Sequence, residues 1–379
     1  MGPHGDRRCQ QRRYRGRASA VMRFGVNMPG TVESARRAQR AEAVGFSSVR
    51  FWDSPLVAGD VFVSAAAAAV TTSRIRIGTS VYVPWTRDPA VTACAFASLN
   101  ALAPGRIELT AGTGRTARRS YGLRPQPLAA FRAHIEAVMT MLSGGDADIV
   151  VEGTTASVRL LHPGITTNIS DPVTLTIAAA GPKIQTLTAD LGAGWADILP
   201  PSAAGEPESL RAMKSAWQAA GRDLDTLRAT YFVALGGILR KGETAESDRI
   251  RATAGPLAMS EVHYWADEVH VQGKTLPPGV PDAVRAAVEG YLPILDQLRS
   301  SPNQVLALQE GHCMFVRPDE EHLLTPELLR SSSCIWSQEE FDSLMSELEQ
   351  AGVHEVVLSV RPRNDDDIDD IARALRLIS

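Results

Sequence analysis

The sequence lacks the features of a membrane protein, a disulfide-stabilised protein and a nucleic-acid-binding protein. No apolar run reaches the roughly 18–20 residues that a membrane helix needs, so we expect no membrane contact. The four cysteines, at positions 9, 94, 313 and 334, have neither metal-site nor disulfide-framework spacing, which predicts no bound metal and fits a reducing cytoplasm. The formal net charge of −4 over 379 residues gives no reason to expect a nucleic-acid partner. These absences leave a soluble, cytoplasmic globular protein as the expected class.

The first 21 residues have almost no apolar content. Six arginines lie between Arg7 and Arg17, and no apolar central region of a signal peptide accompanies them. Such a stretch cannot pack into a core. We therefore predict a disordered basic extension over residues 1–21, with the fold starting at Met22 and an anionic-surface tether as the alternative role.

From residue 22 onward, strand-like and helix-like segments alternate. The predicted strands span residues 23–28, 47–52, 75–83, 106–111, 174–178, 195–199, 229–238 and 355–360. Eight strands are what a closed parallel barrel requires, so we predict an α/β fold, a (β/α)8 TIM barrel, over residues 22–379. A doubly wound open sheet is the alternative, but its Gly-x-Gly-x-x-Gly turn is absent after the first strand, where Pro29-Gly30-Thr31 stands instead.

Helix-like segments fill most of the intervals between these strands. They span residues 32–44, 61–72, 89–102, 128–142, 184–191, 209–220, 243–254, 339–351 and 366–377. Residues 149–151 and 156–160 predict a short hairpin outside the alternation. From about 255 to 333 the pattern is broken by helical segments and by proline and glycine, which predicts a long helical insertion before the last strand.

Small and polar residues gather where the predicted strands end. The third strand ends in Gly78-Thr79-Ser80, and the fourth is followed by Gly112-Thr113-Gly114. Active sites of parallel barrels are built at the carboxyl ends of the strands, and a backbone without large side chains lets a flat ligand approach. The Gly181-Pro182 start of a helix offers free N–H groups to a phosphate. The sequence therefore predicts a cofactor site at these strand ends.

Several of these runs together resemble one known family. They are Ile-Gly-Thr-Ser-Val at 77–81, Arg-Asp-Pro-Ala-Val at 87–91, Pro-Gly-Arg at 104–106, Gly-Thr-Gly at 112–114, Leu-Thr-Ile-Ala-Ala-Ala-Gly-Pro-Lys at 175–183 and, more loosely, Gly-Val-His-Glu-Val-Val at 352–357. The chain resembles the bacterial-luciferase-like superfamily, and within it the deazaflavin-dependent glucose-6-phosphate dehydrogenases and methylenetetrahydromethanopterin reductases. The likeness covers residues 22–200 well and the remainder poorly.

The resemblance implies a TIM barrel whose third strand carries a non-proline cis peptide behind the central ring of the cofactor. By residue matching, that bond joins Ser80 and Val81; an ordinary trans pair is the alternative. Asp53 matches the position at the second strand end where these enzymes contact the cofactor. The implied cofactor is the deazaflavin coenzyme F420, with FMN as the alternative, and the implied assembly is a homodimer.

The chain departs from the dehydrogenases of the family at two points. Ser54 stands where several of them have a proton-accepting histidine, and Arg115 follows Gly-Thr-Gly where a glutamate is expected. Without these bases, oxidation of a sugar phosphate is disfavoured. We expect a reductase that transfers a hydride from reduced deazaflavin to an unsaturated or imine-like small molecule. The alternatives are an FMN-dependent luciferase-like monooxygenase and a non-catalytic barrel.

The predicted site residues follow from the small and polar residues at the strand ends and from the family resemblance. We predict catalytic roles for Asp53, Ser54 and Arg115. The predicted cofactor-binding residues are Asp53, Thr79, Ser80, Val81, Gly112, Thr113, Gly114, Ala179, Ala180, Gly181, Pro182 and Lys183. The substrate-pocket candidates are Asn27, Trp52, Tyr82, Trp85, His263 and His312, whereas His134 is expected to be structural.

Overall fold

The structure is a computed structural model that describes residues 22–362 and 366–378. The predicted basic extension over residues 1–21 lies outside the described residues. No helix in the described ranges is both long and apolar enough to cross a membrane.

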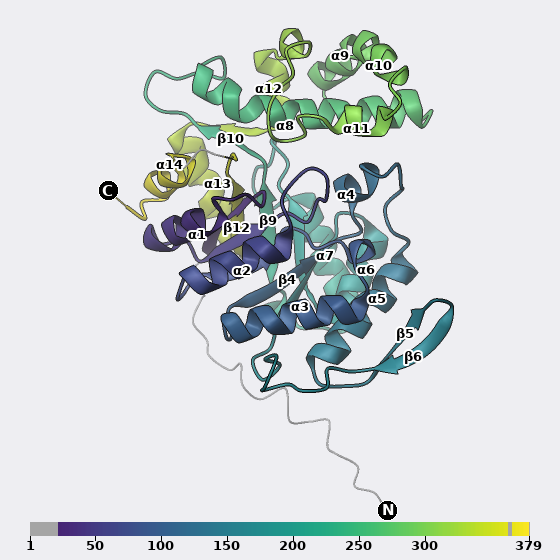
Figure 1. Cartoon of the computed structure of the whole chain (residues 1–379). Coiled ribbons are helices and arrows are strands. Elements are labelled where there is room, and N and C mark those ends of the chain that lie inside the picture. Colours follow the sequence, from purple (N-terminus) through teal and green to yellow (C-terminus); the bar gives the residue numbers. More distant parts are fainter. Residues whose placement is uncertain (1–21, 363–365, 379) are drawn as a thin grey trace, which may run out of the picture.

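Eight parallel strands close into a barrel, as predicted (Figure 1). Their order around the barrel is β1-β12-β9-β8-β7-β4-β3-β2. The strands are β1 (Arg23–Met28), β2 (Ser48–Phe51), β3 (Arg76–Thr79), β4 (Ile107–Ala111), β7 (Thr174–Ala178), β8 (Gly194–Ile198), β9 (Ala229–Val233) and β12 (Val353–Ser359). The open-sheet alternative is therefore wrong.

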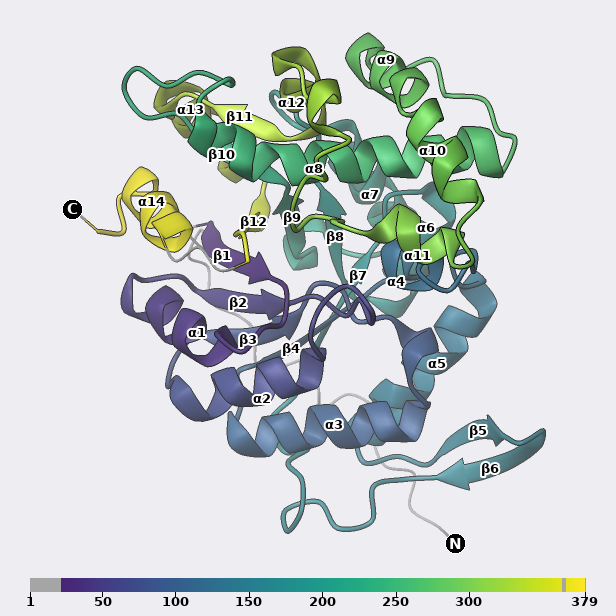
Figure 2. The same cartoon turned by 45° about the horizontal axis from the view of Figure 1, so that its top comes forward.

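A ring of helices covers the outside of the barrel (Figure 2). These helices are α1 (Ser34–Ala43), α2 (Val61–Thr71), α3 (Pro89–Leu102), α5 (Leu128–Leu142), α6 (Pro182–Leu191), α7 (Glu208–Ala219), α13 (Gln338–Gln350) and α14 (Asp366–Ala374). A short helix, α4 (Arg115–Arg119), follows β4 directly. The predicted hairpin is present as β5 (Ala147–Val151) and β6 (Thr154–Val158), which pair antiparallel outside the barrel.

Two predicted strands are shorter in the barrel than the sequence suggested. The predicted strand 229–238 divides: β9 stays in the barrel, whereas β10 (Leu235–Ile238) leaves it and pairs with β11 (Cys334–Trp336). The predicted strand 75–83 ends at Thr79, after which only Tyr82 makes an isolated bridge to the fourth strand. In the first case the apolar run continues past the point where β9 ends and pairs with a second partner.

The insertion begins earlier than predicted, because the chain leaves the barrel at β10 rather than near residue 255. The predicted helix 243–254 is wrong at both ends: α8 (Asp248–Ala266) passes through Pro256 without a break. Gly255 on α8 lets the helix pack closely against Val316 and Leu324, since a Cβ there would lie 3.0 Å from Val316 Cγ2 and 3.1 Å from Leu324 Cδ1. The remaining helices of the insertion are α9 (Asp282–Gly290), α10 (Leu292–Arg299), α11 (Gln304–Gln309) and α12 (Pro326–Ser332).

The insertion has a hydrophobic core of its own, separate from the core of the barrel and its helices. It follows the seventh barrel strand at the carboxyl end. Figure 1 shows it as a layer of helices above the barrel, on the side where the strands end. The insertion therefore covers the face on which barrel enzymes place their active sites, and we call it the roof.

Charged side chains fill the lower interior of the barrel. Arg50 on β2 is 2% exposed and donates to Glu108 Oε2 and Glu355 Oε2, each at 2.6 Å. Arg76 adds ion pairs to both carboxylates, at 3.1 and 3.3 Å. Burial alone would raise the pKa of Glu355, but Arg50 and Arg76 hold that pKa below its ordinary value. Gly78 makes room for this network, since a Cβ there would lie 3.2 Å from Arg50 Nη1.

Candidate active site

The third strand ends in a non-proline cis peptide between Ser80 and Val81, as the resemblance implied. Backbone hydrogen bonds fix the chain on both sides of this bond. Ser80 N–H donates to Phe51 O on β2 at 2.8 Å, and Tyr82 N–H donates to Thr110 O on β4 at 2.7 Å. The segment 80–82 is therefore held between the ends of two neighbouring strands.

Val81 closes the upper end of the barrel interior. Its side chain packs against Ala196, Phe232 and Val357, which project inward from three other strands. Gly112 lies beside it, and a Cβ at Gly112 would come within 2.8 Å of Val81 Cγ2. The result is a small apolar platform above the buried charges, with glycine where a larger residue would collide with it.

The other small residues at the strand ends differ in their surroundings. Gly114 adopts a φ of +79°, and a Cβ there would lie 2.4 Å from Val83 Cγ1, so this position requires glycine on both grounds. Thr113 is half-buried, whereas Thr79 is buried and donates its hydroxyl to Thr110 O at 2.8 Å. The Thr79 side chain is thus engaged by β4.

The turn after β7 forms an open helix N-terminus. Ala179 is buried, and Ala180, Pro182 and Lys183 are exposed. Gly181 is the N-cap of α6, and a Cβ there would meet no atom within 4 Å. Since the first N–H groups of a helix have no intrahelical partner, this turn has both the space and the donors to receive an anion.

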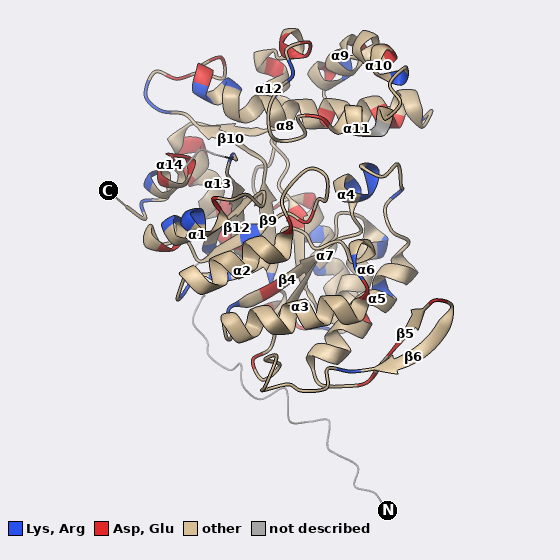
Figure 3. Ribbon diagram, viewed as in Figure 1, with Lys and Arg blue, Asp and Glu red and all other residues tan. Residues whose placement is uncertain are grey.

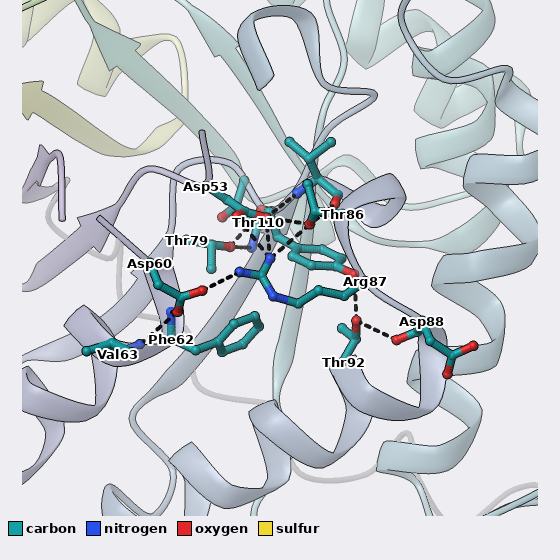
Figure 4. A network of polar contacts seen from close by, with 12 residues as sticks. Asp53, Asp60, Phe62, Val63, Thr79, Thr86, Arg87, Asp88, Thr92 and Thr110 are labelled. Carbon is teal, nitrogen blue, oxygen red and sulfur yellow. Dashed lines mark hydrogen bonds and ion pairs between the residues drawn. The ribbon is translucent and has the colours of Figure 1, made fainter. Parts of the chain in front are cut away.

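Asp53 is buried in a network that ties the end of β2 to the loop after the cis peptide (Figure 4). Val83 N–H donates to Asp53 Oδ2 at 3.0 Å, and Arg87 Nη1 donates to the two oxygens at 3.0 and 3.1 Å. Arg87 also reaches Asp60, the N-cap of α2, at 2.7 Å. Burial raises the pKa of Asp53, an effect that Arg87 opposes. Both oxygens of Asp53 are therefore engaged by neighbouring residues, and its catalytic role stays a prediction.

Arg115 stands at the start of α4 and contacts the roof. Its guanidinium lies 3.1 Å from the ring centroid of Tyr264 on α8, in a cation–π arrangement. Its neighbour Arg119 forms ion pairs with Asp267 and Glu268, which follow α8. Within the described residues, no hydrogen-bond acceptor engages the Arg115 guanidinium. Ser54 is half-buried at the end of β2.

The substrate-pocket candidates are dispersed. Asn27 and Trp52 lie together at adjacent strand ends, where Trp52 Nε1 donates to Asn27 Oδ1 at 3.4 Å. Trp85 is 38% exposed and stacks edge-on with Tyr121, with ring centroids 4.9 Å apart. His312 Nε2 lies 3.2 Å from Thr116 Oγ1 on α4. Of these four candidates, Asn27 is buried and the other three are at least partly exposed.

Tyr82 and His263 are enclosed instead. The Tyr82 hydroxyl lies 2.6 Å from Thr92 Oγ1 and 2.9 Å from His134 Nε2, so Tyr82 is a core residue and His134 has the expected structural place. His263 Nε2 lies 2.6 Å from Glu320 Oε1 inside the insertion core. The prediction that Tyr82 and His263 face a substrate is not supported by this geometry, because both side chains are packed on all sides.

The sequence did not single out Arg87 or Tyr264. Arg87 was present in the resembling run, but nothing in the run indicated a partner on another strand. The structure also holds a cavity of about 240 Å³ between β10, α8 and α14, lined among others by Leu235, Gly237, Arg249, Ser359 and Asp370, and none of the predicted site residues lines it. No group of His, Cys, Asp and Glu within residues 22–362 and 366–378 is arranged to hold a metal ion.

Comparison with known proteins gives consistent matches. The model of the luciferase-like monooxygenase family matches residues 22–291. An F420-dependent glucose-6-phosphate dehydrogenase of Beutenbergia cavernae is 36% identical over 135 residues, 34% of this chain and 39% of that protein. The same-named protein of Kineococcus radiotolerans is 29% identical over 243 residues, 59% of this chain and 71% of that protein. The F420-dependent tetrahydromethanopterin reductase of Methanopyrus kandleri shares the fold, with a TM-score of 0.65, 18% identity and coverage of 94% of this chain and 98% of that one.

Proposed function

The chain belongs to the luciferase-like monooxygenase family, and we propose that it is an F420-dependent reductase of an unsaturated or imine-like small molecule. Relatives named as F420-dependent support the cofactor. We infer the direction of hydride transfer from Asp53, because its carboxylate already accepts hydrogen bonds from Arg87 and from Val83 N–H. With Ser54 beside it, the end of β2 offers no free base to take a proton from an alcohol.

The residues at the strand ends fit a deazaflavin. Val81, backed by Gly112, offers an apolar surface for a flat ring, and the open turn at Gly181 can take a phosphate at the N-terminus of α6. Lys183, exposed in the first turn of α6, adds a positive charge at that point. When bound, the reduced deazaflavin supplies the hydride.

The chain's own residues then bind and orient the acceptor. Asn27 and Trp52, joined by a hydrogen bond at the ends of the first two strands, would contact the acceptor there. Arg115, whose guanidinium lies over the ring of Tyr264, presents its N–H groups for a carboxylate or phosphate of a ligand. The roof restricts the access of water to this region from above.

The test of this proposal is anaerobic turnover. Reduced F420 is mixed with the full-length protein and a panel of activated alkenes and imines, and its oxidation is followed. We expect protein-dependent oxidation of F420 with at least one acceptor and none with an alcohol or sugar phosphate as donor to oxidised F420. If the protein instead consumes reduced FMN, and does so only with oxygen and an organic substrate, the result would favour the monooxygenase alternative. The family includes monooxygenases, as its name states.

We also propose that the chain forms a homodimer through α2 and α3. Neither helix contains a charged residue (Figure 3), although both expose large apolar side chains outward. Val63 and Val70 on α2 are 70% and 65% exposed, and Val91 on α3 is 58% exposed. A two-fold contact places a surface against its own copy, which an uncharged face permits without like-charge repulsion.

Replacing both Val63 and Val70 by glutamate should therefore abolish the dimer. Four carboxylates would meet at the two-fold contact, and desolvating them costs far more than the apolar contact contributes. Size-exclusion chromatography with light scattering should give the 40.7 kDa of one chain for this variant and twice that mass for the parent. Val150→Glu on β5, at a residue also 70% exposed, is the matched control and should remain dimeric. A monomeric parent would contradict the proposal.

A further inference from the structure

A second cavity, of about 360 Å³, lies at the end of the barrel opposite the roof (Figure 1). It is formed where β1, β2 and β3 begin. The charged residues of its lining are three arginines and one glutamate: Arg23, Arg74, Arg76 and Glu42. Barrel enzymes place their chemistry at the carboxyl ends of the strands, so a ligand in this cavity is neither the hydride donor nor the acceptor.

Arg23 has little compensation for its charge. Its Nη2 atom lies 3.8 Å from Glu355 Oε2, but that carboxylate is already shared by Arg50 at 2.6 Å and by Arg76 at 3.3 Å. The Nε atom of Arg23 is buried and has no hydrogen-bond partner within the described residues. A buried donor without a partner is costly, so Arg23 has both a charge and an N–H group left for a ligand.

The glutamate of the lining is occupied by the backbone instead of by an arginine. Glu42 Oε1 accepts from Ser73 N–H and from Ile75 N–H, each at 2.9 Å. Burial alone would raise the pKa of Glu42, but these backbone hydrogen bonds hold that pKa below its ordinary value. In the part of the chain that the structure describes, the exposed Arg74 side chain forms no hydrogen bond or ion pair, and the Ser47 hydroxyl has no hydrogen-bond partner.

The unused groups of this cavity match a phosphate group. Two guanidiniums and one hydroxyl line it from different segments: Arg23 begins β1, Ser47 precedes β2 and Arg74 precedes β3. Guanidinium groups bind carboxylate and phosphate oxygens in pairs. A phosphate group carries close to two negative charges and three acceptor oxygens, whereas a single carboxylate carries one charge and two oxygens. Three donor groups and two uncompensated cations therefore favour phosphate.

We propose that this cavity is a binding site for a phosphate group, held by Arg23, Arg74 and Ser47 at the amino ends of the first three strands. The phosphate is either the free ion or part of a phosphate ester. Because Arg23 and Arg74 are brought together only when the barrel is closed, the ligand binds the folded chain and stabilises it. The site is independent of the proposed reductase activity and of the anion position at the start of α6.

The test uses the full-length protein carrying Gly181→Asp, so that the start of α6 does not compete for the anion. Inorganic phosphate and glycerol 3-phosphate are titrated separately by isothermal calorimetry, with the ionic strength held constant by sodium chloride. We expect saturable binding of at least one of them, and the tighter ligand distinguishes the free ion from an ester. That ligand should also raise the midpoint of thermal unfolding above its value in chloride alone. Binding of neither ligand would overturn the proposal.

Added to this protein, Arg74→Gln should weaken binding of the phosphate ligand at least about tenfold, because a charge-assisted hydrogen bond is lost. The midpoint of thermal unfolding without phosphate should not change, since the Arg74 side chain has no partner to lose. Ser47→Ala should weaken binding by less. Arg132→Gln on α5 is the matched control and should bind as tightly as its parent.

Three results would contradict the proposal. Arg74→Gln and Arg132→Gln could bind phosphate equally well, which would indicate a general effect of salt. Citrate could bind more tightly than either phosphate ligand, which would indicate a carboxylate site. With Gly181 restored, Arg74→Gln could lower the affinity for F420, which would place the cofactor phosphate in this cavity.

Discussion

Replacing Arg50 by methionine should cost about 3 to 5 kcal/mol of the free energy of unfolding, a large share of what a single domain has. Arg50 lies inside the barrel between Glu108 and Glu355, which are 9% and 1% exposed. Methionine fills a similar volume but leaves both carboxylates with one cation fewer in a largely buried site. Urea unfolding followed by tryptophan fluorescence measures the loss.

Two variants make this result interpretable. Arg132→Met breaks a half-exposed pair with Glu136, formed at 2.9 Å, and should cost less than about 1 kcal/mol. Adding Glu108→Gln and Glu355→Gln to Arg50→Met removes the stranded charges and should restore part of the loss. If Arg50→Met unfolds at the same urea concentration as Arg132→Met, the buried network does not support the barrel.

Replacing Gly181 by aspartate should lower the affinity for F420 at least about tenfold while leaving the fold intact. Aspartate is a preferred N-cap residue, and the backbone of Gly181 already has the extended conformation, with φ −99° and ψ 161°, that such a cap adopts. A Cβ there meets no protein atom. The carboxylate would instead occupy the anion position at the start of α6 and repel the phosphate of the cofactor. Fluorescence titration with F420 and thermal unfolding measure the two quantities separately.

Gly181→Asn is the matched neutral variant and should lose much less affinity than Gly181→Asp, since it caps the helix equally well without a charge. Gly279→Asp is the control for added charge, because Gly279 also has open space and lies in the insertion. An unchanged affinity in Gly181→Asp would mean that the cofactor phosphate binds elsewhere.

Much of the fold could be predicted from the sequence because parallel strands buried on both faces read as apolar runs bounded by glycine and proline. The same signal gave a wrong strand boundary where one apolar run forms two strands that pair with different neighbours. Residues 229–238 form one run, yet β9 pairs within the barrel and β10 pairs with β11. Which partner a strand meets depends on segments that lie about a hundred residues away, and no local pattern contains that information.

The site was harder to predict because the same residue type serves different purposes. Gly78 was interpreted as part of a cofactor floor, but its missing side chain makes room for the guanidinium of Arg50. Gly112 does lie beside the cis peptide and accommodates Val81. The charges Arg50, Glu108 and Glu355 within otherwise apolar strands were the signal that could have revealed a filled, ionic barrel interior. Their pairing follows only from closure of the barrel.

The most direct measurement is an equilibrium titration of the purified, full-length protein with F420 and, separately, with FMN, followed by quenching of flavin and tryptophan fluorescence. We predict saturable binding of F420 that is tighter than any binding of FMN. Tighter binding of FMN would instead indicate the monooxygenase. Binding of neither by a folded protein would contradict the proposed cofactor site at the carboxyl ends of the strands.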